Sequence, residues 1–270
     1  MKCALCGMML TQDAPAQHCM NRYYETPDYI SHTDTRSGLM NRIYHPVRNI
    51  MLRRKAKLVM KVSHRCTGRL TDYGAGTGYF AHTMQNEGWK VTAIEKSAQA
   101  RTFAQKRFAI TMMPETRLDN LEPESADVVT LWHVMEHVEA LDHLWQALHV
   151  HLAPQGVMIV AVPNPTSWDA QHYGPYWAAY DVPRHLWHFT PQVMHRLAER
   201  HGFCIEDIRP MPIDAFYISM LSEKYRGSRA PFVRGLCSGL RAWMAAIGHK
   251  ERSSSLIYVF RKKQSEHEKE

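Results

Sequence analysis

The chain of 270 residues has no run of apolar residues long enough to cross a membrane, which takes about 20 in a row. Its first residues also lack the apolar core of a secretory signal peptide. The six cysteines are too few and too scattered for the disulfide framework of a small secreted domain. These absences favour a cytoplasmic protein with reduced thiols, and 45% hydrophobic residues suffice for a sizeable core.

Acidic residues are absent between Asp34 and Asp72, although ten lysines and arginines occur there. Together with a formal net charge of +7, this basic run could bind phosphate-rich partners or an anionic membrane surface. We expect residues 23–66 to form a basic helical extension that contributes to a lid.

Half of a zinc knuckle stands at the start of the chain, where Cys3 and Cys6 have the required spacing. A complete site needs a second pair at a suitable distance, and only His18 and Cys19 follow nearby. Residues 1–22 are therefore interpreted as the remnant of a knuckle, with unliganded cysteines.

Three of the fourteen glycines fall within five residues, at Gly74, Gly76 and Gly78, shortly after Asp72. In the NAD-binding fingerprint the third glycine comes one residue later, and Tyr79 occupies that position here. The spacing therefore disfavours NAD. The carboxylate two residues ahead favours a nucleoside that carries a positively charged amino-acid tail.

Each residue of this turn has its own expected role in binding the cofactor. Gly74 and Gly76 permit positive φ, so that a ligand can approach the bare backbone, and Ala75 lies between them. Gly78 permits close packing of the following helix. Asp72 is expected to hold the ammonium group of the ligand, and amides near the helix N-terminus its carboxylate.

A second acidic residue, Glu95, ends the predicted strand 89–95, seventeen residues after Gly78. Its two carboxylate oxygens can accept both hydroxyl protons of a ribose, as acids at this position do in many nucleoside-binding α/β folds. Two acids at this spacing indicate a nucleoside site rather than two helix-capping loop residues.

Strand and helix signals alternate along the rest of the chain in the order of a doubly wound α/β sheet. We expect a Rossmann-like sheet of seven strands whose last strand is antiparallel. Helix 191–201 has the clearest signals, with Thr190 as N-cap and Gly202 just beyond its end. The ligand is expected at the carboxyl ends of the first strands. The predicted strands are 68–73, 89–95, 110–114, 126–132, 156–162, 203–209 and 255–261, and the other predicted helices are 78–87, 98–108 and 139–152.

With these motifs the chain resembles class I S-adenosylmethionine-dependent methyltransferases, and within them the bacterial small-molecule group often likened to ubiquinone-biosynthesis O-methyltransferases. The turn from Asp72 to Gly78 and the acid at Glu95 carry the cofactor part of the resemblance, and residues 126–137 and 177–189 carry the rest. The resemblance runs from Tyr23 to Phe260. It implies S-adenosylmethionine as the cofactor and in-line transfer of its sulfonium methyl group to a nucleophile.

The resemblance also implies where further cofactor contacts lie. In such enzymes the loop after the third strand usually presents an acid to the adenine amino group and an apolar side chain to its face. Asp119 and Leu118 are the candidates for these two contacts. After the fourth strand, Trp132 and His133 occupy the position that lines the methionine end and faces the substrate.

A methyltransferase that acts on a phenol or enol needs a base for one proton, and a neutral imidazole suits that role. His133 and His185 are the candidate bases, and Asp181 could orient the acceptor. The spacing His133-x-x-Glu136-His137 differs from the His-Glu-x-x-His pattern of zinc proteases, so we expect no metal.

Two long insertions are expected in an S-adenosylmethionine-binding domain over residues 67–270. Residues 163–190 are rich in aromatics, which predicts a lid for a flat apolar acceptor. Within it, Asn164 between two prolines is similar to the Asn-Pro-Pro motif of DNA amino-methyltransferases, although that motif follows the fourth strand and not the fifth. The second insertion, 212–250, contains an amphipathic stretch from Pro231 to Gly248, whose apolar stripe is expected to dock on the domain or a partner subunit.

The expected function is methyl transfer to a small aromatic or lipid-like acceptor, with oxygen favoured over nitrogen and carbon. A lipid-like acceptor would suit peripheral membrane contact through the amphipathic stretch. Two alternatives stay open. One is methylation of RNA or another nucleic acid, which the basic run suggests but which we disfavour. The other is a protein that binds the cofactor without catalysis.

Overall fold

The structure is a computed structural model that describes residues 1–16, 19–20, 23 and 39–263, with the backbone alone for 39–44. It forms two compact units. We call Pro15–Trp132 with His143–Ile159 the glycine-turn unit, and Met1–Ala14, His133–Asp142 and Val160–Glu270 the histidine unit. Both expected insertions fall in the histidine unit together with the first residues, and the domain boundaries expected from the sequence stay a prediction.

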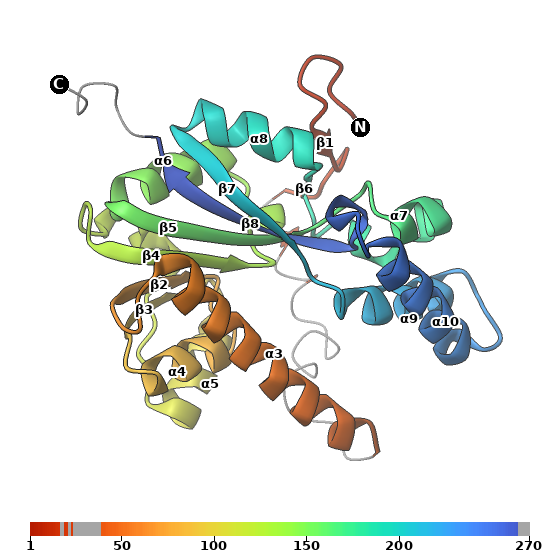
Figure 1. The fold of residues 1–270 in the computed structure, drawn as a ribbon, viewed down its shortest axis with the longest axis horizontal. Coiled ribbons are helices and arrows are strands. Elements are labelled where there is room, and N and C mark those ends of the chain that lie inside the picture. The colour runs from red at the N-terminus through yellow and green to blue at the C-terminus, as the bar shows by residue number, and fades with distance from the viewer. Residues whose placement is uncertain (17–18, 21–22, 24–38, 264–270) are drawn as a thin grey trace. The chain divides into compact units, whose positions relative to one another are not determined.

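The sheet strands of the glycine-turn unit are parallel, with β2 in the middle (Figure 1). Leu70 of β2 pairs with Val91 on one side and Val128 on the other. β2 and β4 are buried over most of their length, as expected for parallel strands covered on both faces, although β2 includes the polar residues Thr71 and Asp72. Figure 1 places α4 and α5 on one side of these strands and α6 on the other. The elements are α3 (Leu39–Ser63), β2 (Arg69–Tyr73), α4 (Tyr79–Asn86), β3 (Lys90–Ile94), α5 (Ala98–Phe108), η1 (Glu115–Asn120), β4 (Ala126–Trp132) and α6 (Leu141–His151).

The predicted strand 110–114 is not one of the sheet strands. Its backbone makes a single bridge to the end of β3, between Ile94 and Met113. The amide of Met113 donates to Ala93 O, and the amide of Glu95 donates to Met113 O, each at 2.9 Å. The segment therefore lies where the expected third strand would lie, but it pairs over too short a stretch to extend the sheet, which has six strands among the described residues.

The histidine unit carries the antiparallel end of the sheet. β5 (Leu152–Pro163) enters it from the glycine-turn unit, and the strand order continues β5-β8-β7, which completes β3-β2-β4-β5-β8-β7. β8 (Ser255–Lys262), the last strand, pairs antiparallel with β7 (Phe203–Pro210), as predicted. α8 (Pro191–Arg200) begins as the sequence predicts, because the Thr190 hydroxyl accepts the Val193 amide at 3.3 Å.

The insertion at 163–190 is held by buried polar contacts inside the histidine unit. Trp177 Nε1 donates to Asp169 Oδ2 at 2.7 Å, and the amide of Ala178 donates to Ser222 Oγ at 2.8 Å. Asn164 is fully buried and uses its amide group to hold two loops. The insertion comprises α7 (Trp168–Tyr173), η3 (Gly174–Tyr176), η4 (Ala178–Tyr180) and β6 (Trp187–His188).

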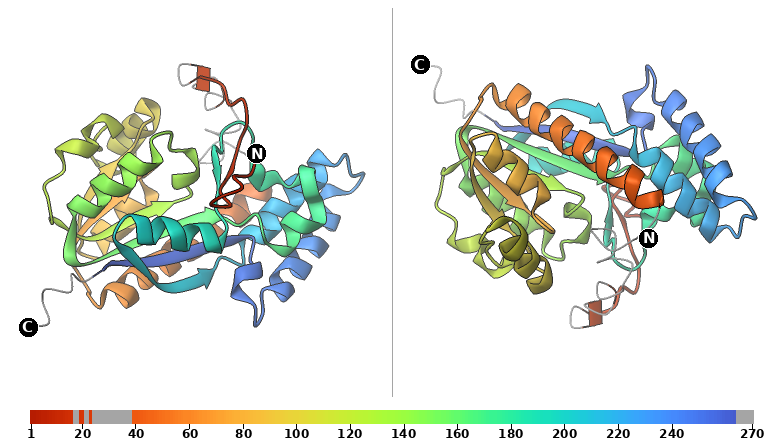
Figure 2. Two further views of the ribbon diagram at one scale, coloured as in Figure 1. Left: turned by 90° about the horizontal axis from the view of Figure 1, so that it is seen from above. Right: turned by 90° about the horizontal axis from the view of Figure 1, so that it is seen from below.

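The second insertion is a helix pair, α9 (Asp214–Tyr225) and α10 (Pro231–Ala245), seen side by side from both directions in Figure 2. The backbones approach closely because Gly235 and Gly239 face α9, where an added Cβ would lie 2.5 Å from Met220 Cα and 2.7 Å from Phe216 Cα. The apolar stripe does not dock on the domain, because α10 buries its small residues and exposes the large ones, and docking on a partner subunit stays a prediction. The exposed residues are Phe232, Val233, Leu236, Leu240, Trp243, Met244 and Ile247.

The first residues of the chain are tied to the rest of the histidine unit. β1 (Met9–Leu10) pairs antiparallel with β6. Cys3 and Cys6 lie in a tight turn in which the amide of Gly7 donates to Cys3 O at 3.0 Å. Among the described residues, no helix combines the length and the apolar character that a membrane span requires. The remaining short helices are η2 (Met135–His137) and η5 (Lys250–Arg252).

Candidate active site

The glycine turn between β2 and α4 has the conformation that its sequence predicts. Gly74, Gly76 and Gly78 have φ of 74°, 54° and 83°. The amides of Gly74 and Ala75 both donate to Ile94 O, at 2.8 and 2.9 Å, which fixes the turn against the end of β3. A Cβ on Gly76 would meet nothing within 4 Å, so the backbone there is open to a ligand.

Gly78 differs from Gly76 in what surrounds it. A Cβ at Gly78 would lie 2.6 Å from Met112 Cε and 3.1 Å from Ala104 Cβ, a side chain of α5. The predicted role of this glycine in close packing is therefore what the structure displays, with α5 and the segment after it as the neighbours.

Asp72 is buried at the carboxyl end of β2, beside the turn. Thr130 of β4 donates its hydroxyl to Asp72 Oδ1 at 2.8 Å. Burial raises the pKa of Asp72 to about 7, and the hydrogen bond from Thr130 and the charge of Lys55 oppose that rise. A buried carboxylate beside a turn with open backbone is suited to pair with a ligand cation.

Glu95 links the glycine turn to the loop that follows β3. Its Oε2 accepts the amide of Gly76 and its Oε1 accepts the amide of Ser97, each at 2.7 Å. A carboxylate has about four lone-pair positions, so each oxygen keeps capacity for one more donor such as a ribose hydroxyl. The acid thus orders the backbone of the turn and leaves acceptor sites for a diol.

The predicted adenine contacts lie in η1, which follows the bridging segment. Leu118 is buried, whereas the Asp119 carboxylate is 67% exposed and lies 2.8 Å from His143 Nε2. Leu118 thus lies in the packed interior and Asp119 on the surface, and the two proposed adenine contacts stay predictions.

Two cations of α3 lie against aromatics of the turn region, which the sequence analysis did not predict. The Arg48 guanidinium lies 3.7 Å from the centroid of the Tyr79 ring, and Lys55 Nζ lies 4.4 Å from that of Trp132. Phe80 meets Trp132 edge-on at 5.4 Å. Both cations belong to the acid-free basic run, but spacing alone could not distinguish them from the exposed Arg53 and Arg54.

His133 directly follows β4 and is the first residue of the segment His133–Asp142 of the histidine unit. Its φ is +58°, its Nε2 lies 3.1 Å from Asp214 Oδ2, and its Nδ1 lies 3.4 Å from Glu136 Oε1. Burial alone would lower the pKa of His133, but these two carboxylates raise it to about 9. The imidazole is therefore a cation at neutral pH. Asp214 follows 81 residues later in the chain, and no sequence signal joins the two.

Glu136, His137 and His185 lie close together in the histidine unit. Glu136 is 1% exposed, and burial alone would raise its pKa, but the neighbouring imidazoles, first that of His133 at 3.4 Å, lower this pKa to about 2. His185 Nε2 lies 4.0 Å from Glu136 Oε1 and 3.6 Å from Asp181 Oδ2. Burial lowers the pKa of His185 to about 4, so this ring is neutral. Of the three predicted catalytic residues, the structure thus places His133 and His185 beside Glu136, and Asp181 beside His185.

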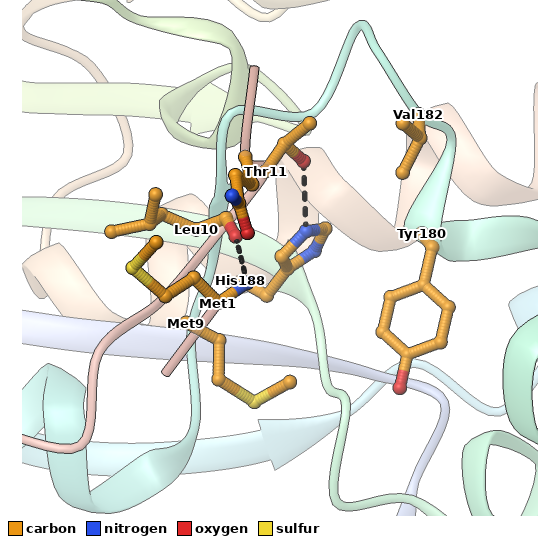
Figure 3. Close-up of a pocket in the computed structure, with 8 residues that line it drawn as sticks. Met1, Met9, Leu10, Thr11, Tyr180, Val182 and His188 are labelled. Carbon is orange, nitrogen blue, oxygen red and sulfur yellow. Dashed lines mark hydrogen bonds between the residues drawn. The ribbon is translucent and has the colours of Figure 1, made fainter. Parts of the chain in front are cut away.

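A pocket of about 270 Å³ lies between β1 and the segment that carries Tyr180 and His188 (Figure 3). His188 Nε2 lies 3.2 Å from Thr11 Oγ1 at its wall. The sequence carries no signal for this pocket, because β1 comes from the far N-terminal segment. Its lining consists of Met1, Met9, Leu10, Thr11, Gln12, Tyr180, Val182 and His188.

Comparison with known proteins identifies the family. Residues 47–208 match the model of a methyltransferase domain family. The chain is 30% identical over 138 residues to the ubiquinone biosynthesis O-methyltransferase of Rickettsia typhi, covering 49% of this chain and 55% of that protein. It is 25% identical over 166 residues to a probable S-adenosylmethionine-dependent methyltransferase of Mycolicibacterium smegmatis, covering 59% and 61%. The chain thus matches less than two thirds of the length of either relative.

Among solved structures, the 1,6-didemethyltoxoflavin-N1-methyltransferase of Burkholderia thailandensis superposes with a TM-score of 0.55 at 15% identity, covering 97% of each chain. At that identity the likeness concerns the fold alone. The chain belongs to the methyltransferase domain family.

Proposed function

We propose that this enzyme transfers a methyl group to an oxygen atom of a small acceptor that is aromatic or lipid-like. The observation that carries the proposal is the neutral imidazole of His185 beside Asp181, in an insertion that supplies buried and half-buried aromatic side chains. The Rickettsia typhi relative is named for O-methylation in ubiquinone biosynthesis, which supports oxygen as the accepting atom.

The residues of the glycine-turn unit fit the cofactor. When bound, S-adenosylmethionine supplies a methyl group on a positively charged sulfur. Asp72 would hold the ammonium group, Glu95 would accept the ribose hydroxyls, and the open backbone at Gly76 would let the ligand approach. Lys55 holds the Asp72 carboxyl closer to its ionised form than burial alone would allow.

The charge states of the two candidate bases differ, and the difference assigns them separate tasks. His133 is protonated at neutral pH and held by Asp214, so it orients or stabilises negative charge and accepts no proton. His185 is neutral, and its Nε2 carries a lone pair. That lone pair can accept a proton from an acceptor hydroxyl or bind a cation. Asp181, 3.6 Å from His185 Nε2, would orient the acceptor.

Nucleic-acid methylation has less support in the structure. The Asn164 amide donates to Glu251 O and Ser253 O and accepts from Thr166, so it has no donor left for a flipped base. Arg48 and Lys55 of the basic run are already stacked on aromatics of the turn region. A cofactor-binding protein without catalysis remains the second alternative, and turnover separates it from the enzyme.

We also propose peripheral contact of α10 with an anionic membrane surface. Its exposed apolar residues run along one side of the helix, and Arg234 and Arg241 are exposed on the same helix. Apolar and basic side chains together suit an interface with acidic lipid headgroups. Flotation with anionic vesicles, compared between the wild type and Trp243→Ser, tests the contact, and equal recovery of both proteins without vesicle association would exclude it.

The acceptor class is tested by release of S-adenosylhomocysteine over a panel of catechols, phenols, quinols, primary amines and transfer RNA. We expect turnover with the hydroxylated aromatics and background rates with amines and RNA. Turnover with RNA that falls steeply with added salt would favour the nucleic-acid alternative. Cofactor binding without turnover on any member would favour the non-catalytic one.

A further inference from the structure

Three donor side chains of the histidine unit converge on one point. Glu136, His137 and His185 each offer a ligand atom, and these atoms all lie within 4.8 Å of one another. The rings of His137 and His185 meet edge-on, with centroids 4.5 Å apart. Ligand atoms of a tetrahedral zinc site lie about 3.3 Å apart, as follows from bonds of about 2.0–2.1 Å. Small rotations of these side chains would close the set around an ion.

The hydrogen bonds of the two imidazoles indicate which ring nitrogen is available to bind an ion. His137 Nδ1 lies 3.0 Å from Arg184 O, and His185 Nδ1 lies 2.9 Å from Ala179 O. A carbonyl oxygen only accepts hydrogen bonds, so each Nδ1 carries the proton and each Nε2 keeps its lone pair in the neutral ring. Metal-binding histidines are oriented in this way, with the other ring nitrogen donating to a backbone carbonyl.

Glu136 provides the second, independent observation. It is 1% exposed, and neither carboxylate oxygen has a hydrogen-bond partner among the described residues, although His133 Nδ1 lies 3.4 Å from Oε1. The protonated imidazole of His133 balances the carboxylate charge without donating a hydrogen bond to it, so both oxygens keep lone pairs that a metal ion can use. A divalent cation satisfies all three groups together.

We propose that Glu136, His137 and His185 bind a divalent transition-metal ion, with Zn²⁺ as the ion that fits two imidazoles and one carboxylate. Mg²⁺ and Ca²⁺ fit less well because they prefer oxygen ligands. The proposal departs from the sequence expectation of no metal. That expectation compared only the local spacing with a known motif, whereas the third ligand comes from the insertion at 163–190.

The experiment measures zinc bound by the full chain, produced without a histidine tag, stripped with a chelator and dialysed against Zn²⁺. We expect about one tightly bound equivalent, as for a single site with three protein ligands. Glu136→Gln and His185→Gln should each weaken Zn²⁺ binding at least about 100-fold, beyond the 10–100-fold effect typical of outer-shell partners. The matched control His172→Gln, an exposed histidine of the same unit, should leave binding unchanged.

Two further variants keep the result interpretable. Cys3→Ser with Cys6→Ser removes the half knuckle, and zinc retained by that double variant but lost in Glu136→Gln supports the cluster. If Glu136→Gln does not fold, visible absorption of Co²⁺ bound to the wild type is compared with that of His137→Gln. Wild-type zinc content in the cluster variants, zinc lost only with the two cysteines, or no zinc above the control level in the wild type would each overturn the proposal. The readout is metal content, so it is independent of methyl-acceptor identity.

Discussion

The glycine turn and the histidine cluster are both polar sites, but they are built in different ways. In the turn, Asp72, Gly74, Gly76 and Glu95 come from two consecutive strand–loop connections, and most contacts are to backbone. The cluster is assembled from His133–His137, Asp181–His185 and Asp214, which belong to distant parts of the chain.

The difference lies in what sets the chemistry of each group. The role of a glycine at positive φ, or of a carboxylate that accepts a backbone amide, depends on the geometry of the backbone. Such a role can therefore be predicted from the fold. His133 and His185 are the same residue type, yet the pKa of one is about 9 and that of the other about 4. Burial and neighbouring carboxylates set these two pKa values, so the local sequence around each histidine cannot predict them.

We expect the largest effect on cofactor affinity from a substitution of Glu95, the acid that links the glycine turn to the end of β3. Glu95→Ala removes the acceptors of the Gly76 and Ser97 amides together with the predicted ribose contact. We expect S-adenosylhomocysteine binding to weaken by about 3 kcal/mol, or about 100-fold, because hydrogen bonds to a charged group are lost. Calorimetric titration measures it, with the exposed Glu87→Ala as control. Equal affinities of the two variants would mean that the pocket is misplaced.

A pair of glycine substitutions separates binding from folding within the turn. Gly78→Ala should lower the free energy of unfolding by about 2 kcal/mol, because a positive-φ residue would also collide with Met112 and Ala104. Gly76→Ala meets no neighbour, so its main effect should be on cofactor affinity. Thermal unfolding and calorimetry on both variants give the comparison. Larger destabilisation by Gly76→Ala than by Gly78→Ala would contradict the packing described.

Much of the glycine-turn unit could be predicted because its signals are local. Helix 98–108 and the positive-φ glycines at Gly74 and Gly76 are confirmed, since each follows from adjacent residues. The third strand was expected at 110–114, and only Met113 pairs there. Whether a short apolar segment forms one bridge or a full strand depends on how far it runs beside its neighbour, which sequence does not specify.

The histidine unit was predictable in its residues and not in their arrangement. Sequence singled out His133, His185 and Asp181, but not Asp214, whose carboxylate keeps His133 protonated. The apolar stripe of α10 could be predicted from the spacing of its residues, but not the fact that it is exposed. Gly235 determines which face of α10 is buried, because the close approach of the α9 backbone requires small residues on that face.

The pH dependence of binding tests Asp72 directly. Its raised pKa of about 7 means that the ionised form, which pairs with the ligand ammonium, accumulates as pH rises. Affinity for S-adenosylhomocysteine should therefore increase about tenfold from about pH 5.5 to about pH 7, where the ligand amine stays protonated. Asp72→Asn should bind weakly with a flat profile.

Stability should respond to the same carboxyl in the opposite direction. Because the folded-state pKa exceeds the unfolded value of 3.8, the contribution of protonated Asp72 is fully present below 3.8 and is lost as pH rises through about 7. The difference in free energy of unfolding between the wild type and Asp72→Asn should thus shift against the wild type over this range. A wild type whose affinity and relative stability both stay constant with pH would exclude a raised pKa.

The smallest effect concerns the cation that α3 contributes to the turn region. Lys55 Nζ lies on the face of Trp132, and its charge lowers the pKa of Asp72. Lys55→Met keeps the length of the side chain and removes the charge, so it should cost roughly 0.5–1 kcal/mol of stability and move the midpoint of the affinity–pH profile upward. Lys57→Met, exposed on the same helix, is the matched control. An unchanged midpoint in Lys55→Met would assign Lys55 to packing on Trp132 alone, whereas an upward shift would make α3 part of the cofactor site.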